Sequence, residues 1–124
     1  RLDRAALRAV AQAFPQAAPA DSALLSGPWT EDEARQLAQW FSGSRLTEIP
    51  VNRAKRRLVL ERLAQEFEPG LRYDERTVNA VLQLFHADHA TLRRYLVDEG
   101  LLTRAEGVYW RTGGRVGPPA GSYE

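Results

Sequence analysis

The chain has 124 residues, of which 44% are hydrophobic, and its 17 basic and 16 acidic side chains leave a formal net charge of +1. This length allows one domain with a modest core. The lack of cysteine excludes disulfides, thiolate metal sites and a cysteine nucleophile. No apolar run is long enough to span a bilayer and no secretory leader is recognisable, so we expect a cytoplasmic protein.

Residues 1–43 are expected to form two helices joined by a linker. Apolar residues at helical spacing predict a helix over residues 1–14, and the proline after them ends it. The next stretch is rich in Pro, Ala and Ser and reads as a linker, which could include a turn of helix at residues 22–25. Thr30 and Glu33 then form a capping-box pattern, which predicts a second helix that ends at "SG".

Three further helices and a hairpin are expected in the rest of the chain. Asn52, Asp74 and Asp88 can each cap a helix, and each precedes apolar residues at helical spacing. The helix after Asp88 should end at Gly100. "LLTR" and "VYWR" flank "AEG" and predict two short strands joined by a tight turn. The remaining residues, 112–124, have the composition of a disordered tail.

The order of three helices followed by a hairpin is that of a winged helix. The predicted fold class is therefore mainly α (α+β), with a winged-helix-like domain at residues 44–111. Two N-terminal helices and their linker, residues 1–43, precede it. The alternative is a generic small helical bundle with a trailing hairpin.

Several motifs within residues 41–111 carry a family resemblance: "RLTEIP", "FEPG" before "RYDE", "VNAVL", "TLRRYLVDEGLL" and the closing "YWR". This segment resembles a bacterial domain of unknown function that often forms the C-terminal part of ArsR-type winged-helix transcription regulators. The opening "RLDRAALRAVAQAF" is similar to the segment after the wing of an ArsR-type domain. The resemblance implies a role in transcription control and a DNA-binding domain upstream. Since the chain starts with arginine and contains no methionine, we expect a fragment or a processed product.

The helix over residues 88–100 is the candidate for major-groove contact. Its helical wheel places Arg94 and Val97 opposite the apolar side, with Arg93 on one flank and Thr91 and Asp98 on the other. Arginines in this position suit base edges and phosphates. An exposed valine instead suits a protein neighbour, and an aspartate repels phosphates. The alternative is that one arginine pairs with an acid, Asp88 or Asp98, and only supports the fold.

The segment "NRAKRR", residues 52–57, places four cations at a helix N-terminus, where the helix dipole disfavours positive charge. This arrangement favours a patch that contacts nucleic-acid phosphates. The alternative is a solvated helix face with internal pairs such as Arg57 with Glu61. The predicted nucleic-acid contacts are therefore Arg53, Lys55, Arg56, Arg57, Thr91, Arg93, Arg94 and, on the hairpin, Arg104.

Other candidate sites are weaker. His86 and His89 in "FHADH" resemble the start of a metal site, but they straddle a helix cap and no third ligand is evident, so no metal is expected. No catalytic motif is present, and we expect neither an enzyme nor a cofactor. The aromatic residues could stack bases, but packing is the favoured interpretation; they are Trp29, Trp40, Phe41, Tyr95, Tyr109 and Trp110.

Two functions remain open from the sequence. The first is a DNA-binding or accessory module of an ArsR-like transcription regulator, with duplex DNA as its partner. The second is a protein-interaction, dimerisation or effector-sensing domain that has the winged shape and makes no DNA contact. The fold and the "NRAKRR" segment favour the first. The low net charge, Asp98 and an exposed Val97 favour the second.

Overall fold

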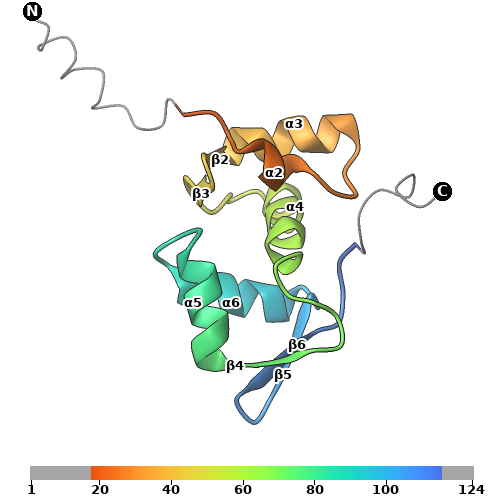
Figure 1. Ribbon diagram of the computed structural model, residues 1–124, viewed down its shortest axis with the longest axis vertical. Helices are drawn as coiled ribbons and strands as arrows, with labels where there is room; N and C mark the ends of the chain where they lie inside the picture. The colour runs from red at the N-terminus through yellow and green to blue at the C-terminus, as the bar shows by residue number, and fades with distance from the viewer. Residues whose placement is uncertain (1–17, 116–124) are drawn as a thin grey trace, which may run out of the picture.

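The computed structural model describes residues 18–115, which form a small mixed α+β domain. Within these residues there are five helices and two small sheets (Figure 1). The predicted helix over residues 1–14 and the tail beyond residue 115 lie outside the described residues. In chain order, the elements are α2 (Ser22–Leu25), α3 (Glu31–Trp40), β2 (Phe41–Ser42), β3 (Arg45–Leu46), α4 (Arg53–Ala64), β4 (Arg72–Asp74), α5 (Glu75–Gln83), α6 (His89–Asp98), β5 (Leu102–Ala105) and β6 (Val108–Arg111).

Helices α3, α4, α5 and α6 start where the sequence predicts them, because each of the four is fixed by a side-chain cap. Thr30 accepts a hydrogen bond from the backbone N–H of Glu33 at 3.1 Å, and the Glu33 carboxylate accepts one from the Thr30 N–H at 3.0 Å. This is the reciprocal capping box. The caps of α4, α5 and α6 are likewise the predicted side chains, Asn52, Asp74 and Asp88.

The hairpin is also confirmed, and the structure adds a third strand to it. The sheet order is β4-β6-β5, with antiparallel pairing throughout, so that Tyr109 lies between Tyr73 and Arg104. Glu106 and Gly107 have φ values of 52° and 78°, which suits a two-residue type I′ turn. The sequence prediction lacked β4, because three residues that end in a helix cap carry no alternating pattern of their own.

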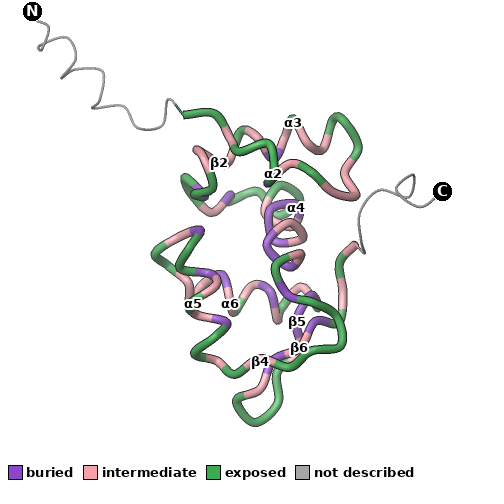
Figure 2. The backbone as a smooth tube through the Cα atoms, in the orientation of Figure 1, coloured by how far each residue is buried: buried purple, intermediate pink, exposed green. Residues whose placement is uncertain are grey.

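The core is one hydrophobic cluster centred on α4. Four of its residues, Val59, Leu60, Leu63 and Ala64, have no exposed surface. Figure 2 shows buried positions concentrated along α4 and on the parts of α6 and the sheet that face it. Burial of this kind is the main force that holds a small domain together.

The N-terminal helices belong to the same core. Leu24 of α2, Leu37 of α3 and Phe41 are buried in the cluster that α4 centres, and Trp40 packs against it. Residues 40–41 therefore dock the N-terminal helices onto the rest of the domain. Arg62 of α4 also donates a hydrogen bond to the backbone carbonyl of Leu24 at 2.6 Å. In Figure 1, α4 lies between α2 and α3 on one side and α5, α6 and the larger sheet on the other.

Residues 112–115, which open the predicted tail, lie against the domain. Arg115 forms ion pairs with Glu33 of α3 and with Glu61 of α4, the second at 3.3 Å. Its guanidinium also lies 5.0 Å from the centre of the Trp29 ring. Arg115 therefore joins the N-terminal helices, α4 and the end of the sheet. Between residues 18 and 115, no helix has the length and apolar character that crossing a bilayer requires.

Candidate functional site

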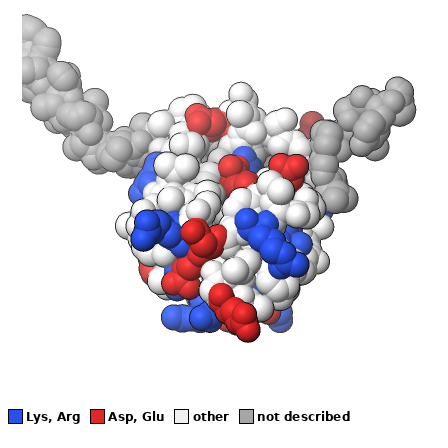
Figure 3. Space-filling view, turned by 60° about the horizontal axis from the view of Figure 1, so that its bottom comes forward, with Lys and Arg blue, Asp and Glu red and all other residues white. Residues whose placement is uncertain are grey.

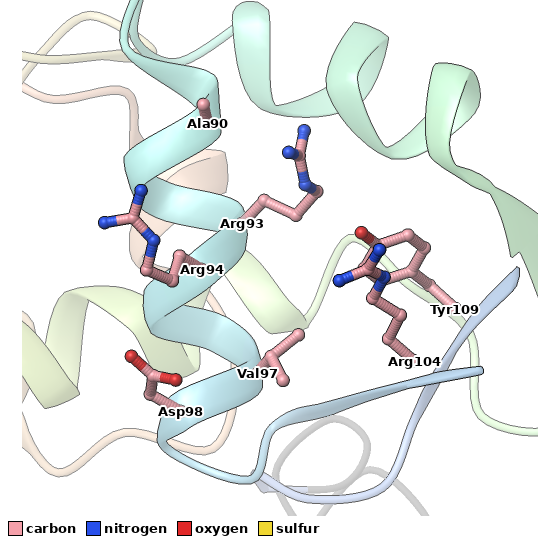
Figure 4. Close-up of a pocket in the computed structure, with 7 residues that line it drawn as sticks. All are labelled: Ala90, Arg93, Arg94, Val97, Asp98, Arg104 and Tyr109. Carbon is pink, nitrogen blue, oxygen red and sulfur yellow. The ribbon is translucent and has the colours of Figure 1, made fainter. Parts of the chain in front are cut away.

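A pocket of about 250 Å³ lies between α6 and the β5–β6 hairpin (Figure 4). It brings together three of the predicted nucleic-acid contacts, two from α6 and one from β5. The pocket is lined by Ala90, Arg93, Arg94, Val97, Asp98, Arg104 and Tyr109.

The outer face of α6 differs from the helical-wheel prediction at one position. Ala90, Arg94 and Asp98 are exposed, one turn apart. Val97, predicted to be exposed, is instead half-buried and packs against the core beneath the hairpin. The wheel treats the helix alone, and the hairpin covers the side on which Val97 lies. The prediction of an unpartnered valine on this helix is therefore wrong.

Arg93 is held in place from α5. Its Nη1 donates a hydrogen bond to Oδ1 of Asn79, and its Nη2 lies 3.8 Å from Oε2 of Glu75. Glu75 Oε1 also accepts a hydrogen bond from the hydroxyl of Tyr109 at 3.1 Å. Burial and then this hydrogen bond raise the pKa of Tyr109. The sequence suggested Asp88 or Asp98 as an arginine partner on this helix, whereas the partners of Arg93 lie on α5.

Two of the arginines keep their charge free. Arg104 lies opposite Tyr109 in the sheet, with its guanidinium 6.0 Å from the centre of that ring. Neither Arg94 nor Arg104 forms an ion pair or a side-chain hydrogen bond with another residue in the range 18–115. Thr91, the other predicted contact on α6, uses its backbone N–H in the helix cap, where it donates to Asp88 at 3.3 Å.

The "NRAKRR" cations are mostly engaged inside the molecule. Arg53 and Arg57 both donate to the carboxylate of Glu99, at 3.1 Å from Arg53 Nε and 3.0 Å from Arg57 Nη1. The Glu99 side chain is only 8% exposed. Hydrogen bonds from Arg53 and from Arg57 lower its pKa against the opposing effect of burial. A negative charge at the α6 C-terminus thus compensates for positive charges at the α4 N-terminus.

The cations of this segment differ in how many further contacts their side chains make. Arg57 also pairs with Glu61 at 3.2 Å, the internal pair that the sequence suggested as an alternative. Arg56 donates to the carbonyl of Val51 at 2.9 Å and lies 4.4 Å above the centre of the Tyr95 ring. Lys55 has no side-chain partner among residues 18–115. Intramolecular contacts therefore account for three of the four cations.

The two histidines are not arranged as a metal site. His86 Nδ1 accepts a hydrogen bond from the backbone N–H of Asp88 at 2.9 Å, just before α6. Nδ1 of His89 is buried without a partner. The part of the chain from residue 18 to 115 contains no group of three His, Cys, Asp or Glu side chains that could hold an ion.

The aromatic side chains are engaged in packing. Tyr109 is 1% exposed in the core, and Arg72 lies 4.3 Å above the half-buried ring of Trp110 on the sheet. Figure 3 turns the lower end of the molecule forward, where Lys and Arg groups are separated by Asp and Glu groups. On this face the positive charge is divided into small clusters.

Sequence reasoning missed three residues that organise the site: Asn79 and Glu75, which hold Arg93, and Glu99, which holds Arg53 and Arg57. One of them left a signal. Glu99 falls on the same side of the α6 wheel as Leu92, Tyr95 and Leu96, and an acid on an apolar side calls for a buried cation. The other contacts join residues far apart in the chain and have no local signature.

One comparison with known proteins gives a match. The family model described as an uncharacterized protein conserved in bacteria (DUF2087) matches residues 45–111, more than half of the chain. No curated protein and no solved structure matches. The resemblance to a bacterial domain of unknown function is thereby confirmed, and its link to ArsR-type regulators stays a prediction.

Proposed function

Since the chain belongs to the bacterial family DUF2087, whose description names no activity, we propose its function from its geometry: a winged-helix module that binds duplex DNA in a transcription regulator. The order α4, β4, α5, α6, β5, β6 is that of winged-helix proteins. In such proteins the last helix enters the major groove and the hairpin lies beside it. The ArsR-like setting is part of the proposal and rests on the sequence resemblance.

The observation that carries this proposal is the position of two free arginines. Arg94 lies on the exposed face of α6, and Arg104 lies on the hairpin next to it. Neither is neutralised by another residue in the range 18–115. Unpaired guanidinium groups on a helix and on the hairpin beside it can contact base edges and the adjacent phosphates.

The "NRAKRR" segment contributes less than its composition suggests. Arg53 is 77% exposed, but its guanidinium already contacts Glu99. Arg57 forms ion pairs with both Glu61 and Glu99. Lys55 is the member of this segment with a free charge. With a net charge of only +1, the chain is expected to bind DNA with modest affinity that falls steeply with salt.

The test is fluorescence anisotropy of the 124-residue chain on mixed-sequence duplex DNA, from about 50 to 200 mM salt. We expect Arg94→Ala combined with Arg104→Ala to weaken binding and to reduce the salt slope by about 2, since each lost phosphate contact lowers it by about 1. Arg35→Ala is the control, because it removes an exposed arginine on α3. Unchanged binding by the double variant, or no binding at the lowest salt, would contradict the proposal.

A protein-interaction module is the second candidate. Val51 is 90% exposed and Leu84 is 67% exposed, so both apolar side chains are available to a protein partner. If these side chains meet a second copy of the chain, light scattering should give a dimer mass that Leu84→Asp reduces to a monomer. A monomer mass for the unaltered protein would count against self-association.

A further inference from the structure

We propose that the pocket between α6 and the β5–β6 hairpin is a phosphate site, in which Arg93 and Arg104 hold one phosphate group between them. The inference deepens the proposed function and rests on it for the source of the phosphate, a phosphodiester of the DNA backbone. The chemistry of the site is independent of that source.

The two guanidinium groups approach the pocket from different elements. Figure 4 shows Arg93 and Val97 on the side of α6 that faces the hairpin, with Arg104 opposite them on β5. Arg94 and Asp98 lie on the other side of the helix axis in this view. The hollow between the helix and the hairpin is therefore bordered by cations on both sides, while Asp98, the one acid among its lining residues, lies on the other side of α6 in this view.

The side chain of Arg93 and the backbone of Arg104 are positioned before any ligand arrives. Arg93 is fixed by its hydrogen bond to Asn79 and by the carboxylate of Glu75. Arg104 is fixed at its backbone by the pairing of β5 with β6, opposite Tyr109. A ligand that bridges them loses less conformational entropy than one that must order two free side chains.

The charge in the pocket is not balanced. Glu75 is the acid closest to Arg93, but it lies 3.8 Å away and also accepts the hydroxyl of Tyr109. Arg104 has no acidic partner among residues 18–115. Like charges held on two sides of one hollow repel each other, and a bound anion would remove that repulsion.

The donors and the shape favour phosphate. A guanidinium carries five N–H donors, and Asn79 and Glu75 engage only part of those on Arg93. A phosphate presents oxygens in several directions and can accept from two guanidinium groups at once. The pocket volume of about 250 Å³ exceeds that of one water, about 30 Å³, by enough to hold a phosphate and part of its sugar.

The buried side chains beneath the pocket strengthen the attraction between the arginines and a bound phosphate. Tyr109 is 1% exposed and Val97 packs against the core, so the lower surface of the pocket is protein rather than water. Charge–charge attraction is stronger where solvent is excluded on one side. A phosphate bound here would anchor the hairpin to the DNA backbone without reading its sequence.

The experiment monitors the arginine Nε–Hε and backbone amide NMR signals of the full chain. Two probes are titrated separately: a short mixed-sequence duplex and inorganic phosphate. Both should shift the side-chain signals of Arg93 and Arg104 and the amide of Val97. Arg104→Ala should abolish these shifts, weaken duplex binding about fivefold or more at low salt, and lower the salt slope by about 1.

Two variants serve as controls. Arg35→Ala removes the same charge from α3, far from the pocket in sequence, and should leave the slope unchanged. Arg104→Lys keeps the charge without the planar fork and should retain the slope while losing part of the affinity. Circular dichroism verifies that each variant is folded, as expected for substitutions of exposed side chains.

The outcomes separate the two proposals. If the duplex binds while Arg104→Ala changes neither slope nor signals, the phosphate site is overturned and the DNA-binding function stands. If inorganic phosphate shifts the pocket signals while the duplex does not bind, the site stands for a small phosphorylated ligand and the DNA-binding function is overturned. If the duplex does not bind and inorganic phosphate moves no pocket signal, both are overturned.

Discussion

Arg57 is joined to Glu99 twice, because its Nη1 donates to the backbone carbonyl at 2.8 Å and to the carboxylate at 3.0 Å. The pair connects the N-terminus of α4 to the C-cap of α6. Each charge opposes the dipole of its own helix. The attraction between the two charges offsets the unfavourable interaction of each charge with its own helix dipole.

Replacement of Glu99 by glutamine should destabilise the protein. The variant loses the charge that Arg53 and Arg57 share, while the bond to the backbone carbonyl remains. We expect the free energy of unfolding in urea to fall by about 1.5–3 kcal/mol, as for hydrogen bonds to charged groups. Glu48→Gln, at an exposed loop position, should change it by less than about 0.5 kcal/mol. Equal values for the two variants would contradict a stabilising role for the Glu99 contacts.

Acid should weaken the contact between α3 and residue 115. The hydrogen bond from Arg115, followed by the one from the Thr30 N–H, lowers the pKa of Glu33 from 4.5 to about 2. A carboxyl whose pKa is depressed in the folded state stabilises the fold above its unfolded pKa. This stability is therefore complete above pH 4.5 and is lost as the pH falls towards about 2.

The variant Glu33→Gln tests this dependence. It should be less stable than the unaltered protein at neutral pH and should lose less stability between pH 4.5 and about 2. Part of the acid sensitivity should persist, since the pKa values of Asp74, Asp88 and Glu99 are also lowered. Parallel curves of unfolding free energy against pH for both proteins would show that Glu33 does not cause the loss of stability in acid.

The N-terminal helices should unfold together with the rest of the domain. Leu37 of α3 has no exposed surface and lies in the shared core, so Leu37→Ala should cost about 2–5 kcal/mol. Trp29 and Trp40 report on this end of the molecule, and Trp110 reports on the sheet. We expect fluorescence and far-UV circular dichroism to show one coincident transition. Two separate transitions would mean that residues 18–43 form an independent unit.

The capping box of α3 provides a more local test. Thr30→Ala removes the acceptor for the Glu33 N–H and should lower the unfolding free energy by about 0.5–2 kcal/mol. Thr30→Ser keeps the hydroxyl and should stay close to the unaltered protein. If the alanine and serine variants have the same urea midpoint, the hydroxyl makes no net contribution.

The features that the sequence predicted well have local causes. Helices α3 to α6 start directly after Thr30, Asn52, Asp74 and Asp88 because each of these side chains accepts a hydrogen bond from a backbone N–H three residues later. The β5–β6 hairpin depends on a tight turn with the glycine at a positive φ. Signals of this kind can be read without knowledge of the rest of the fold.

The features that were missed depend on contacts between distant residues. Strand β4 has only three residues, and its pairing partner comes after α5 and α6. The compensation of the "NRAKRR" charges depends on Glu99, 42 residues from Arg57. The ion pair of Arg115 with Glu33 spans 82 residues and begins in a segment whose composition predicted a tail. The tertiary fold decides all three, and no short stretch of sequence encodes them.

The position of β6 in the sheet has a consequence for how the protein is made. Of the three strands in this sheet, β6 is the last to leave the ribosome, yet it lies between β4 and β5 and pairs with both. Until Val108 and the residues after it are synthesised, β4 has no partner in the larger sheet and Tyr109 cannot fill its place in the core. Helices α3 and α4 can meet earlier during translation, whereas the sheet and the pocket beside α6 form only once nearly all of the described chain is present.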